Sequence, residues 1–152
     1  MANDRLRPVP ERPSNRTVTL VDSNVLLDIL TDDPTWSTWS GTALAACRDA
    51  GVLVINPIVY AEISVRFDRV EDLDEAVPAT DFLREQLPYP AGFLAGKAYV
   101  RYRRQGGTKN SPIADFYIGA HAAVSDYQLL TRDSARYRSY FPRLRLIAPM
   151  YG

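Results

Sequence analysis

The chain has 152 residues and no net charge, with 46% hydrophobic and 24% charged residues, close to the average of soluble globular proteins. This composition excludes a wholly disordered chain, a collagen-like fibre and a disulfide scaffold, and the length favours one domain. The single cysteine, Cys47, cannot form an intramolecular disulfide. We find no secretory signal and no apolar stretch of the ~20 residues that a membrane span needs, and therefore expect a cytoplasmic protein.

The first half of the chain alternates strands and helices. Residues 1–16 contain three prolines and almost nothing to bury, which predicts an extended or disordered leader before one domain over 17–149. Apolar residues on both faces of short segments are typical of buried parallel strands. Asn56 and Pro57 form a helix cap and a first-turn proline. The predicted elements are a strand over 17–21, helices over 25–30 and 36–50, a strand over 52–55 and a helix over 57–67.

The second half continues the same alternation. Its predicted elements are one or two helices over 71–87, helices over 91–105 and about 112–125, and strands over 127–131 and 144–147. A further strand near Leu87–Tyr89 is an open alternative in this proline-rich segment. Strands that alternate with helices indicate an α/β protein with a parallel sheet.

Four acidic residues fall where this architecture gathers ligands, at the carboxyl ends of strands or in the helix turns that follow. They are Asp22, Glu62, Asp115 and Asp133. Clustered carboxylates repel one another, and a divalent cation relieves this repulsion. Oxygen-only ligands favour Mg²⁺ or Mn²⁺ over Zn²⁺. Each acid alone also has an ordinary reading as a helix cap, a first-turn charge, a turn residue or a surface residue.

The chain resembles PIN-domain ribonucleases, especially VapC-type toxins of bacterial toxin–antitoxin modules. The resemblance rests on four motifs in order, which are VDSNVLLD (21–28), NPIVYAE (56–62), DFYIGAHA (115–122) and LLTRD (129–133). It implies a three-layer α/β/α fold with a parallel sheet of four to five strands and Mg²⁺- or Mn²⁺-dependent RNA cleavage. It also implies a homodimer and a cognate antitoxin that blocks the cleft.

The resemblance carries the family's acidic ligands over to the same four positions. We expect Asp22 and Asp115 to be central metal ligands, Glu62 a ligand or a base for water, and Asp133 a second-ion or water-mediated ligand. Hydrogen bonds that orient these carboxylates are expected from Asn24 and Thr131. The lone histidine, His121, lies six residues after Asp115 and therefore points away from the cluster on a helix.

The charges are divided unequally along the chain. Residues 1–96 carry 8 Lys and Arg against 15 Asp and Glu, whereas residues 97–152 carry 10 against 3. A basic second half with interleaved tyrosines suits an RNA partner, although both halves also read as ordinary solvated faces. The residues expected to bind the substrate are Arg101, Arg103, Arg104, Lys109 and Arg132.

Two alternatives from other functional classes stay open. A PIN-like module that binds RNA or protein without cleaving it would share the fold. A haloacid-dehalogenase-like phosphatase also carries an acid after its first strand, but its chemistry needs a second aspartate where this chain has Asn24. Trp36 and Trp39 are core residues in one interpretation and a protein interface in the other.

Overall fold

A five-stranded parallel sheet forms the centre of the computed structural model, which describes residues 16–108 and 113–150. The order of the strands is β3-β2-β1-β4-β5, and every neighbouring pair is parallel. The strands are β1 (Thr17–Val21), β2 (Gly51–Ile55), β3 (Phe82–Arg84), β4 (Gln128–Leu130) and β5 (Leu146–Ile147). The predicted α/β fold with a parallel sheet is confirmed.

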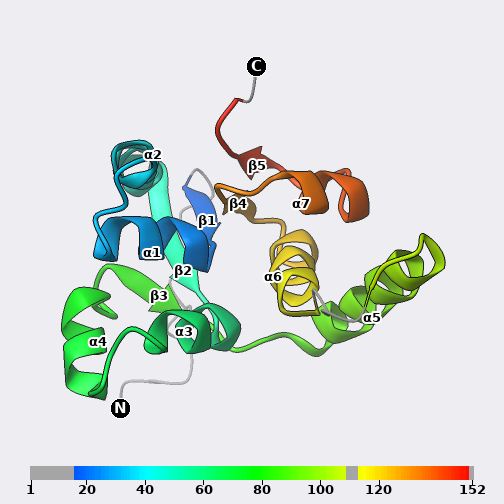
Figure 1. Cartoon of the computed structure of the whole chain (residues 1–152), viewed down its shortest axis with the longest axis horizontal. Helices are drawn as coiled ribbons and strands as arrows, with labels where there is room; N and C mark the ends of the chain where they lie inside the picture. Colours follow the sequence, from blue (N-terminus) through cyan, green and yellow to red (C-terminus); the bar gives the residue numbers. More distant parts are fainter. Residues whose placement is uncertain (1–15, 109–112, 151–152) are drawn as a thin grey trace, which may run out of the picture.

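Helices cover the sheet on both sides. The described helices are α1 (Ser23–Leu30), α2 (Ser37–Ala50), α3 (Pro57–Ser64), α4 (Val70–Ala76), α5 (Tyr89–Arg104), α6 (Ile113–Val124) and α7 (Ala135–Tyr140). Figure 1 shows α1, α2 and α4 on one side of the sheet and α5, α6 and α7 on the other. This is the expected three-layer arrangement.

The central strands are those with the longest apolar runs. Leu20 and Val21 of β1, Val54 of β2 and Leu129 of β4 are completely buried. Fully burying an aliphatic side chain of this size stabilises a fold by roughly 1.5–3 kcal/mol. The strands with apolar residues on both faces therefore occupy the middle of the sheet.

Gly51 stands where α2 ends and β2 begins, and it pairs with Thr17 of β1. A Cβ atom at this position would lie 1.9 Å from the carbonyl oxygen of Thr17, which is backbone and cannot move aside. Only glycine lets the two strands approach to their observed register.

The expectation of helices over 71–87 is wrong in its second part. Helix α4 ends at Ala76, and residues 82–84 form β3 beside β2. Of the three residues of β3 only Phe82 is buried, because β3 lies at the edge of the sheet. A three-residue strand with two exposed side chains has no distinctive apolar pattern. The alternative strand near Leu87–Tyr89 is also wrong, because α5 begins at Tyr89.

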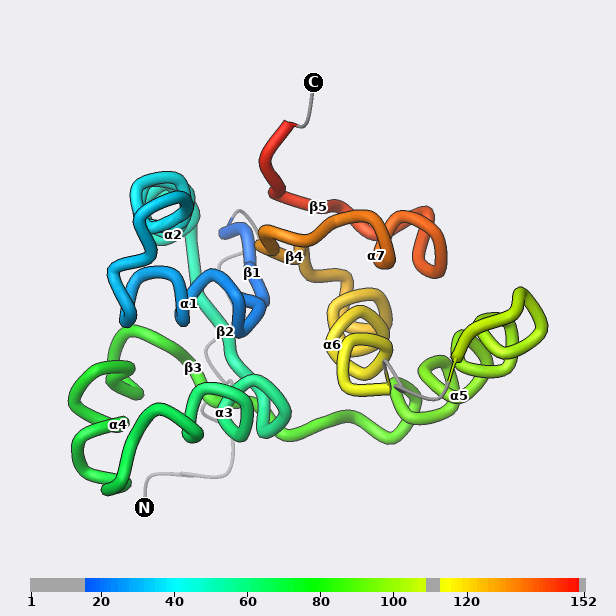
Figure 2. The backbone as a smooth tube through the Cα atoms, in the orientation of Figure 1, coloured from blue at the N-terminus to red at the C-terminus, as the bar shows by residue number. Residues whose placement is uncertain are grey.

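Two further differences concern the second half of the chain. Helix α5 begins at Tyr89, two residues before the predicted start at residue 91. Pro90 lies in its first turn, where the missing N–H of proline costs nothing. Helix α7 was not predicted. The predicted leader, apart from Arg16, lies outside the described residues. Figure 2 shows α5 packed beside α6 and far from β1–β3.

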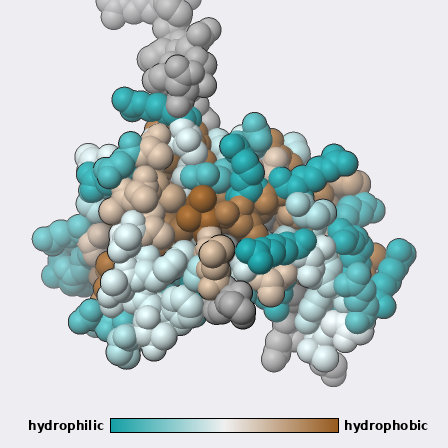
Figure 3. All heavy atoms as spheres, turned by 90° about the horizontal axis from the view of Figure 1, so that it is seen from above, coloured by the Kyte–Doolittle hydropathy of each residue, from teal (hydrophilic) through white to brown (hydrophobic). Residues whose placement is uncertain are grey.

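The surface carries both apolar and hydrophilic regions. Figure 3 shows hydrophobic side chains near the centre of the face seen from above, with hydrophilic side chains around them. Over the residues that the structure describes, no helix is long and apolar enough to cross a membrane.

Candidate active site

The four acids predicted from the sequence line one pocket. It has a volume of about 160 Å³ and is lined by Asp22, Ser23, Asn24, Glu62, Asp115, Asp133, Arg136 and Tyr137. The chain runs from β1 to β2 on one side and returns to β4 on the other, so the strand order reverses between β1 and β4. Asp22 directly follows β1, and Asp133 lies shortly after β4. The pocket therefore lies at the topological switch point, where open α/β sheets bind ligands.

Asp22 lies deepest, with 2% of its surface exposed. One of its carboxylate oxygens caps α1 by accepting a hydrogen bond from the Ser23 backbone N–H at 2.8 Å. The other accepts from the hydroxyls of Thr131 at 2.8 Å and Tyr137 at 2.9 Å. Burial raises the pKa of Asp22 to about 6, with repulsion from Asp115 and Glu62 adding to it, although both hydroxyl bonds oppose the shift. Asp22 thus caps α1, which is one of its ordinary readings, and also lines the acidic pocket.

Glu62 and Asp115 face the same space from α3 and α6. Burial raises the pKa of Glu62, and repulsion from Asp115 raises it further. Burial also raises the pKa of Asp115, against the opposing effect of Arg136. Within the described part of the chain, Glu62 Oε1 is buried without a hydrogen-bond partner. A buried carboxylate oxygen without a donor is costly, and a cation is the usual partner that offsets this cost.

Asn24 and Thr131 form the hydrogen bonds to the Asp22 carboxylate that the sequence predicts. The amide nitrogen of Asn24 donates to Asp22 Oδ2 and to the Thr131 hydroxyl, each at 3.4 Å. The amide oxygen of Asn24 accepts from the Arg132 backbone N–H at 3.1 Å. The Asp133 backbone N–H donates to the Thr131 hydroxyl at 3.1 Å. These bonds tie the segment after β4 to the start of α1.

The donor set fits a divalent cation in the type of its ligand atoms. The pocket offers carboxylate oxygens, the ligands that Mg²⁺ and Mn²⁺ prefer, and one of them is unpaired. As the side chains stand, no group of three or more His, Cys, Asp or Glu residues in the described ranges is arranged to hold an ion. Arg136 forms an ion pair with Asp115 Oδ2 in this arrangement. The pocket thus contains carboxylates of the kind that bind divalent cations, and one of them, Asp115, is paired with Arg136.

Three residues of the pocket were missed as site residues: Ser23, at the start of α1, and two residues of α7. Arg136 and Tyr137 belong to α7 and reach the acids from the far side of β4. Tyr137 is almost fully buried, and burial, followed by repulsion from Asp22, raises its pKa well above the ordinary value for tyrosine. The phenol therefore stays a hydrogen-bond donor at neutral pH. The only sequence signal of the two α7 residues was their position shortly after the fourth motif.

The predicted substrate-binding arginines lie in two different environments. Arg101, Arg103 and Arg104 form the exposed last turn of α5. Arg132, in contrast, donates from Nε at 2.8 Å and from Nη2 at 3.0 Å to the two carboxylate oxygens of Asp28, and it lies over the Trp36 ring. This contact pairs a buried carboxylate and fixes the segment after β4 against α1. Lys109 lies outside the described residues.

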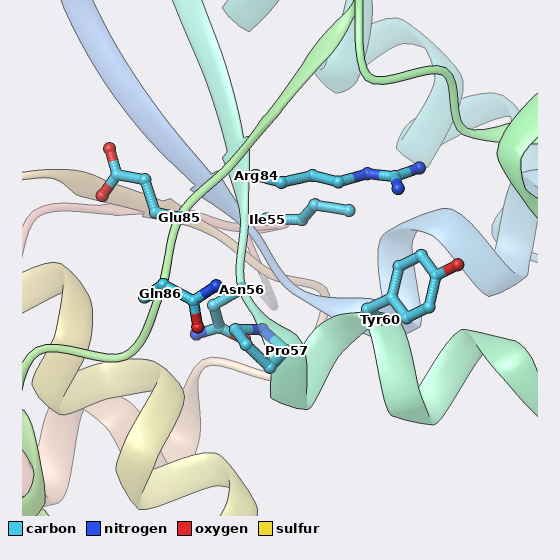
Figure 4. Close-up of a pocket in the computed structure, with 7 residues that line it drawn as sticks. All are labelled: Ile55, Asn56, Pro57, Tyr60, Arg84, Glu85 and Gln86. Atoms are coloured by element: carbon cyan, nitrogen blue, oxygen red, sulfur yellow. The ribbon is translucent and has the colours of Figure 1, made fainter.

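A second pocket lies on another face of α3, with a volume of about 210 Å³. Figure 4 shows Arg84 extending toward Tyr60 while Glu85 points the opposite way. The Arg84 guanidinium lies 5.0 Å from the centre of the Tyr60 ring, and both side chains bind Asp74, at 2.8 and 3.0 Å. The charge of Arg84 is therefore paired with that of Asp74.

His121 belongs to a polar network beside this second pocket and contacts none of the four acids. The Asn56 amide oxygen caps α3 by accepting from Val59 N at 2.9 Å, so its amide nitrogen faces His121 Nδ1 at 3.1 Å. The other ring nitrogen, Nε2, therefore carries the hydrogen and donates to Glu85 at 3.3 Å. Burial lowers the pKa of His121, which keeps the ring neutral. The expectation that His121 packs away from the cluster is confirmed.

Acidic side chains from separate segments gather at the switch point of a doubly wound sheet, and this places the chain among the open α/β proteins that carry their ligand site at this edge. The PIN domain family model matches residues 19–141, more than half of the chain. The chain belongs to the PIN domain family.

Several solved structures share its fold. A toxin–antitoxin complex from Klebsiella pneumoniae has a TM-score of 0.61 at 16% identity, covering 85% of this chain and 95% of that one. VapBC2 from Rickettsia felis, bound to a DNA fragment from the promoter, has a TM-score of 0.66 at 15% identity, covering 87% of this chain and 98% of that one. VapBC-1 from nontypeable Haemophilus influenzae gives 0.66 at 16% identity with the same coverage. FitAcB from Neisseria gonorrhoeae gives 0.63 at 17%, covering 85% and 96%. No curated protein matches the chain.

Proposed function

We propose that this protein is a divalent-metal-dependent endoribonuclease and the toxin of a toxin–antitoxin pair. One observation carries the nuclease proposal. Four acids from four separate segments line a single pocket at the switch point, and one of their buried oxygens, Glu62 Oε1, has no protein donor in the described part of the chain. The toxin–antitoxin complex and the VapBC structures among the solved structures of this fold support the toxin role.

The residues of the pocket divide the work of phosphodiester hydrolysis. Asp22 and Asp115 would hold the ion, with Glu62 as a further ligand or as the base for water, and Asp133 would hold a second ion or a bound water. A bound Mg²⁺ or Mn²⁺ supplies an activated water and offsets the negative charge that develops on the phosphate. Thr131, Tyr137 and the backbone N–H of Ser23 fix the Asp22 carboxylate by hydrogen bonds before any ligand arrives. Such preorganisation avoids reorientation during the reaction.

RNA is the proposed substrate, and the last turn of α5 its proposed binding surface. Arg101, Arg103 and Arg104 are exposed there. Arg101 lies over the Tyr140 ring at 5.3 Å, which places a cation and an aromatic ring together on this surface. Unpaired nucleotides bind through phosphate contacts and base stacking on such groups.

An antitoxin, a second copy of the chain and a cytoplasmic location complete the proposal. A groove of about 370 Å³ lies between α1, α2 and the segment from α4 to β3, and is lined mainly by apolar residues such as Leu26, Leu30 and Leu44. At the start of α2, Trp36 and Trp39 are partly exposed and pack edge to face. An apolar groove suits a helix of a partner protein, and exposed tryptophans are common anchors of protein interfaces.

The two alternatives differ from this proposal in specific ways. A non-catalytic binding module has no need for carboxylates held at elevated pKa, as Asp22, Glu62 and Asp115 are. A phosphatase of the haloacid-dehalogenase type needs an acid where Asn24 instead binds Asp22 and Arg132.

The test is cleavage of a mixed RNA substrate by the full chain with Mg²⁺ or Mn²⁺ and with a chelator. We expect cleavage only with the metal, and its loss in Asp115→Asn. The matched control is Asp126→Asn, which makes the same change at an exposed residue outside the pocket. Metal-independent cleavage, or full activity of Asp115→Asn, contradicts the proposal. Growth arrest on expression, relieved by the neighbouring small protein, tests the toxin role separately.

A further inference from the structure

Arg136 is the only cation among the described residues that line the acidic pocket. Its guanidinium forms an ion pair with Asp115 through Nη1 and Oδ2. The side chains of Arg136 and Asp115 are 38% and 34% exposed, whereas Asp22 is almost fully buried. The ion pair therefore lies closer to solvent than Asp22 does.

A second arginine shows what a fixed ion pair looks like in this chain. Arg132 binds both oxygens of Asp28, whose side chain is 3% exposed and which also accepts a hydrogen bond from Ser40 at 2.8 Å. A bidentate contact to a buried carboxylate is geometrically locked. Arg136 instead uses one nitrogen to reach one oxygen of a carboxylate that faces solvent. Exposed single-contact pairs are weak and exchange partners readily.

The ion pair and a bound cation need the same oxygens. Asp115 is an expected metal ligand, and Arg136 neutralises it in the arrangement that the structure shows. In that arrangement no three acids in the described ranges are placed to hold an ion, and Glu62 Oε1 has no donor. Releasing Asp115 from Arg136 would free one further carboxylate in the same pocket.

We propose that Arg136 is a built-in counter-ion of the acidic pocket, which competes with the divalent cation for Asp115 and exchanges this carboxylate for an RNA phosphate when the cation binds. This inference rests on the proposed nuclease function and adds a regulatory role for one residue of that site. A guanidinium pairs with carboxylate and phosphate oxygens by the same geometry, so the exchange needs only a rotation of a half-exposed side chain. The metal-free pocket is thereby kept partly neutral.

The test is titration of the full chain with Mn²⁺ by isothermal calorimetry, without RNA. Removing the competing charge in Arg136→Gln should tighten Mn²⁺ binding roughly three- to tenfold, the size of effect expected for one nearby charge at a partly exposed site. The matched control is Arg138→Gln, which removes the same charge from the same helix at an exposed residue outside the pocket, and should change binding less than twofold. Arg136→Lys keeps the charge and should bind Mn²⁺ within about twofold of the wild type.

Two further measurements identify the mechanism. In an Asp115→Asn background, Arg136→Gln should no longer tighten Mn²⁺ binding, because the contested carboxylate is gone. RNA cleavage by Arg136→Gln at saturating Mn²⁺ should be slower than in the wild type, since the phosphate then has one partner fewer. Circular dichroism establishes that each variant is folded, and Arg136→Met replaces Arg136→Gln in these comparisons if the latter does not fold.

Equal or weaker Mn²⁺ binding in Arg136→Gln relative to Arg138→Gln would overturn the counter-ion proposal, while wild-type cleavage would leave the nuclease proposal intact. A wild-type chain that neither binds Mn²⁺ nor cleaves RNA contradicts the proposed function itself. The two failures are therefore distinguishable.

Discussion

The two polar regions on either side of α3 are built from similar groups but in opposite ways. Around His121, the hydrogen bonds of Asn56, Glu85 and Tyr127 pair donors with acceptors, and Tyr127 donates to both oxygens of Glu85 at 3.0 and 2.7 Å. In the acidic pocket, like charges face one another, the pKa values of three carboxyls are raised, and Glu62 Oε1 lacks a protein donor among the described residues. The first arrangement stabilises the fold, whereas the second costs stability, which is typical of functional sites.

The largest effect is expected at the acidic pocket. Asp115→Asn should lower metal-dependent RNA cleavage at least ~100-fold, because a proposed ligand of the ion is removed, while the thermal midpoint of the metal-free protein stays the same or rises. Cleavage assays and calorimetry of the same preparation measure both. A strong loss of stability would show that this carboxylate belongs with the structural region.

At His121 we expect a large loss of stability and little change in RNA cleavage. His121→Ala leaves Asn56 and Glu85 without their ring contacts and opens a cavity, so unfolding free energy should fall by about 2–4 kcal/mol. Urea unfolding measures this decrease. Cleavage by the folded variant at low temperature should stay within fivefold of the wild type. A folded His121→Ala variant without cleavage would mean that the network positions Glu62 through α3, and the two regions would then be one unit.

The two regions should change the unfolding free energy in opposite directions as the pH rises. The pKa of Asp22 rises from 3.8 to about 6 on folding, so the folded chain binds this proton more tightly than the unfolded chain. The resulting stability is present at low pH and is lost as pH rises from about 4 to about 6. Asp22→Asn lacks this pH-dependent decrease. The unfolding free energy of the variant should therefore rise relative to that of the wild type over this range, by up to about 3 kcal/mol at pH 7.

The lowered pKa of His121 has the opposite consequence. A buried neutral histidine costs stability as pH falls below its ordinary value of 6.5. Chemical unfolding of the wild type and Asp22→Asn from pH 4 to pH 7 isolates the Asp22 contribution, because the His121 contribution is common to both. A pH-independent difference between them would show that Asp22 is not desolvated as described.

The smallest effect is expected outside both regions. Replacing Arg103 and Arg104 together by alanine should reduce the salt dependence of RNA binding, by about 0.7 in the slope of log K against log salt for each phosphate that is no longer bound. Fluorescence anisotropy with a single-stranded RNA at several salt concentrations measures the slope. The matched control is the double replacement of Arg66 and Arg69, two exposed arginines after α3. An unchanged slope in the Arg103 and Arg104 variant assigns them to ordinary surface charge.

The predictability of the molecule follows the strength of the local signals. Strands β1, β2 and β4 were predicted because their residues are apolar on both faces, and this follows from burial in the middle of a sheet. Strand β3 was missed because Leu83 and Arg84 are exposed at the sheet edge, so only Phe82 signals burial. The form of β3 therefore depends on its pairing with β2, which the local sequence does not contain.

The same reasoning explains the candidate site. The four acids were predicted because each follows an element whose end lies at a known edge of the sheet. Arg136 and Tyr137 were not predicted as site residues, because their roles depend on contacts between distant parts of the sequence. Arg136 contacts Asp115, 21 residues earlier, and Tyr137 contacts Asp22, 115 residues earlier. Arg132 was expected on the RNA surface, but its partner Asp28, 104 residues earlier, is visible only in the folded chain.

The hydrogen bond from Thr131 to Asp22 joins residues 109 positions apart and has a consequence for how the protein is made. Strands β1 and β2, with α1 and α2, are synthesised early and can pair while translation continues, whereas β4 and α7 emerge near the end. An incomplete chain therefore has Asp22 without Thr131, Tyr137 or Arg136. A partner that binds α1 and α2 would meet its surface on the growing chain before the acidic pocket exists, so inhibition would precede activity during synthesis.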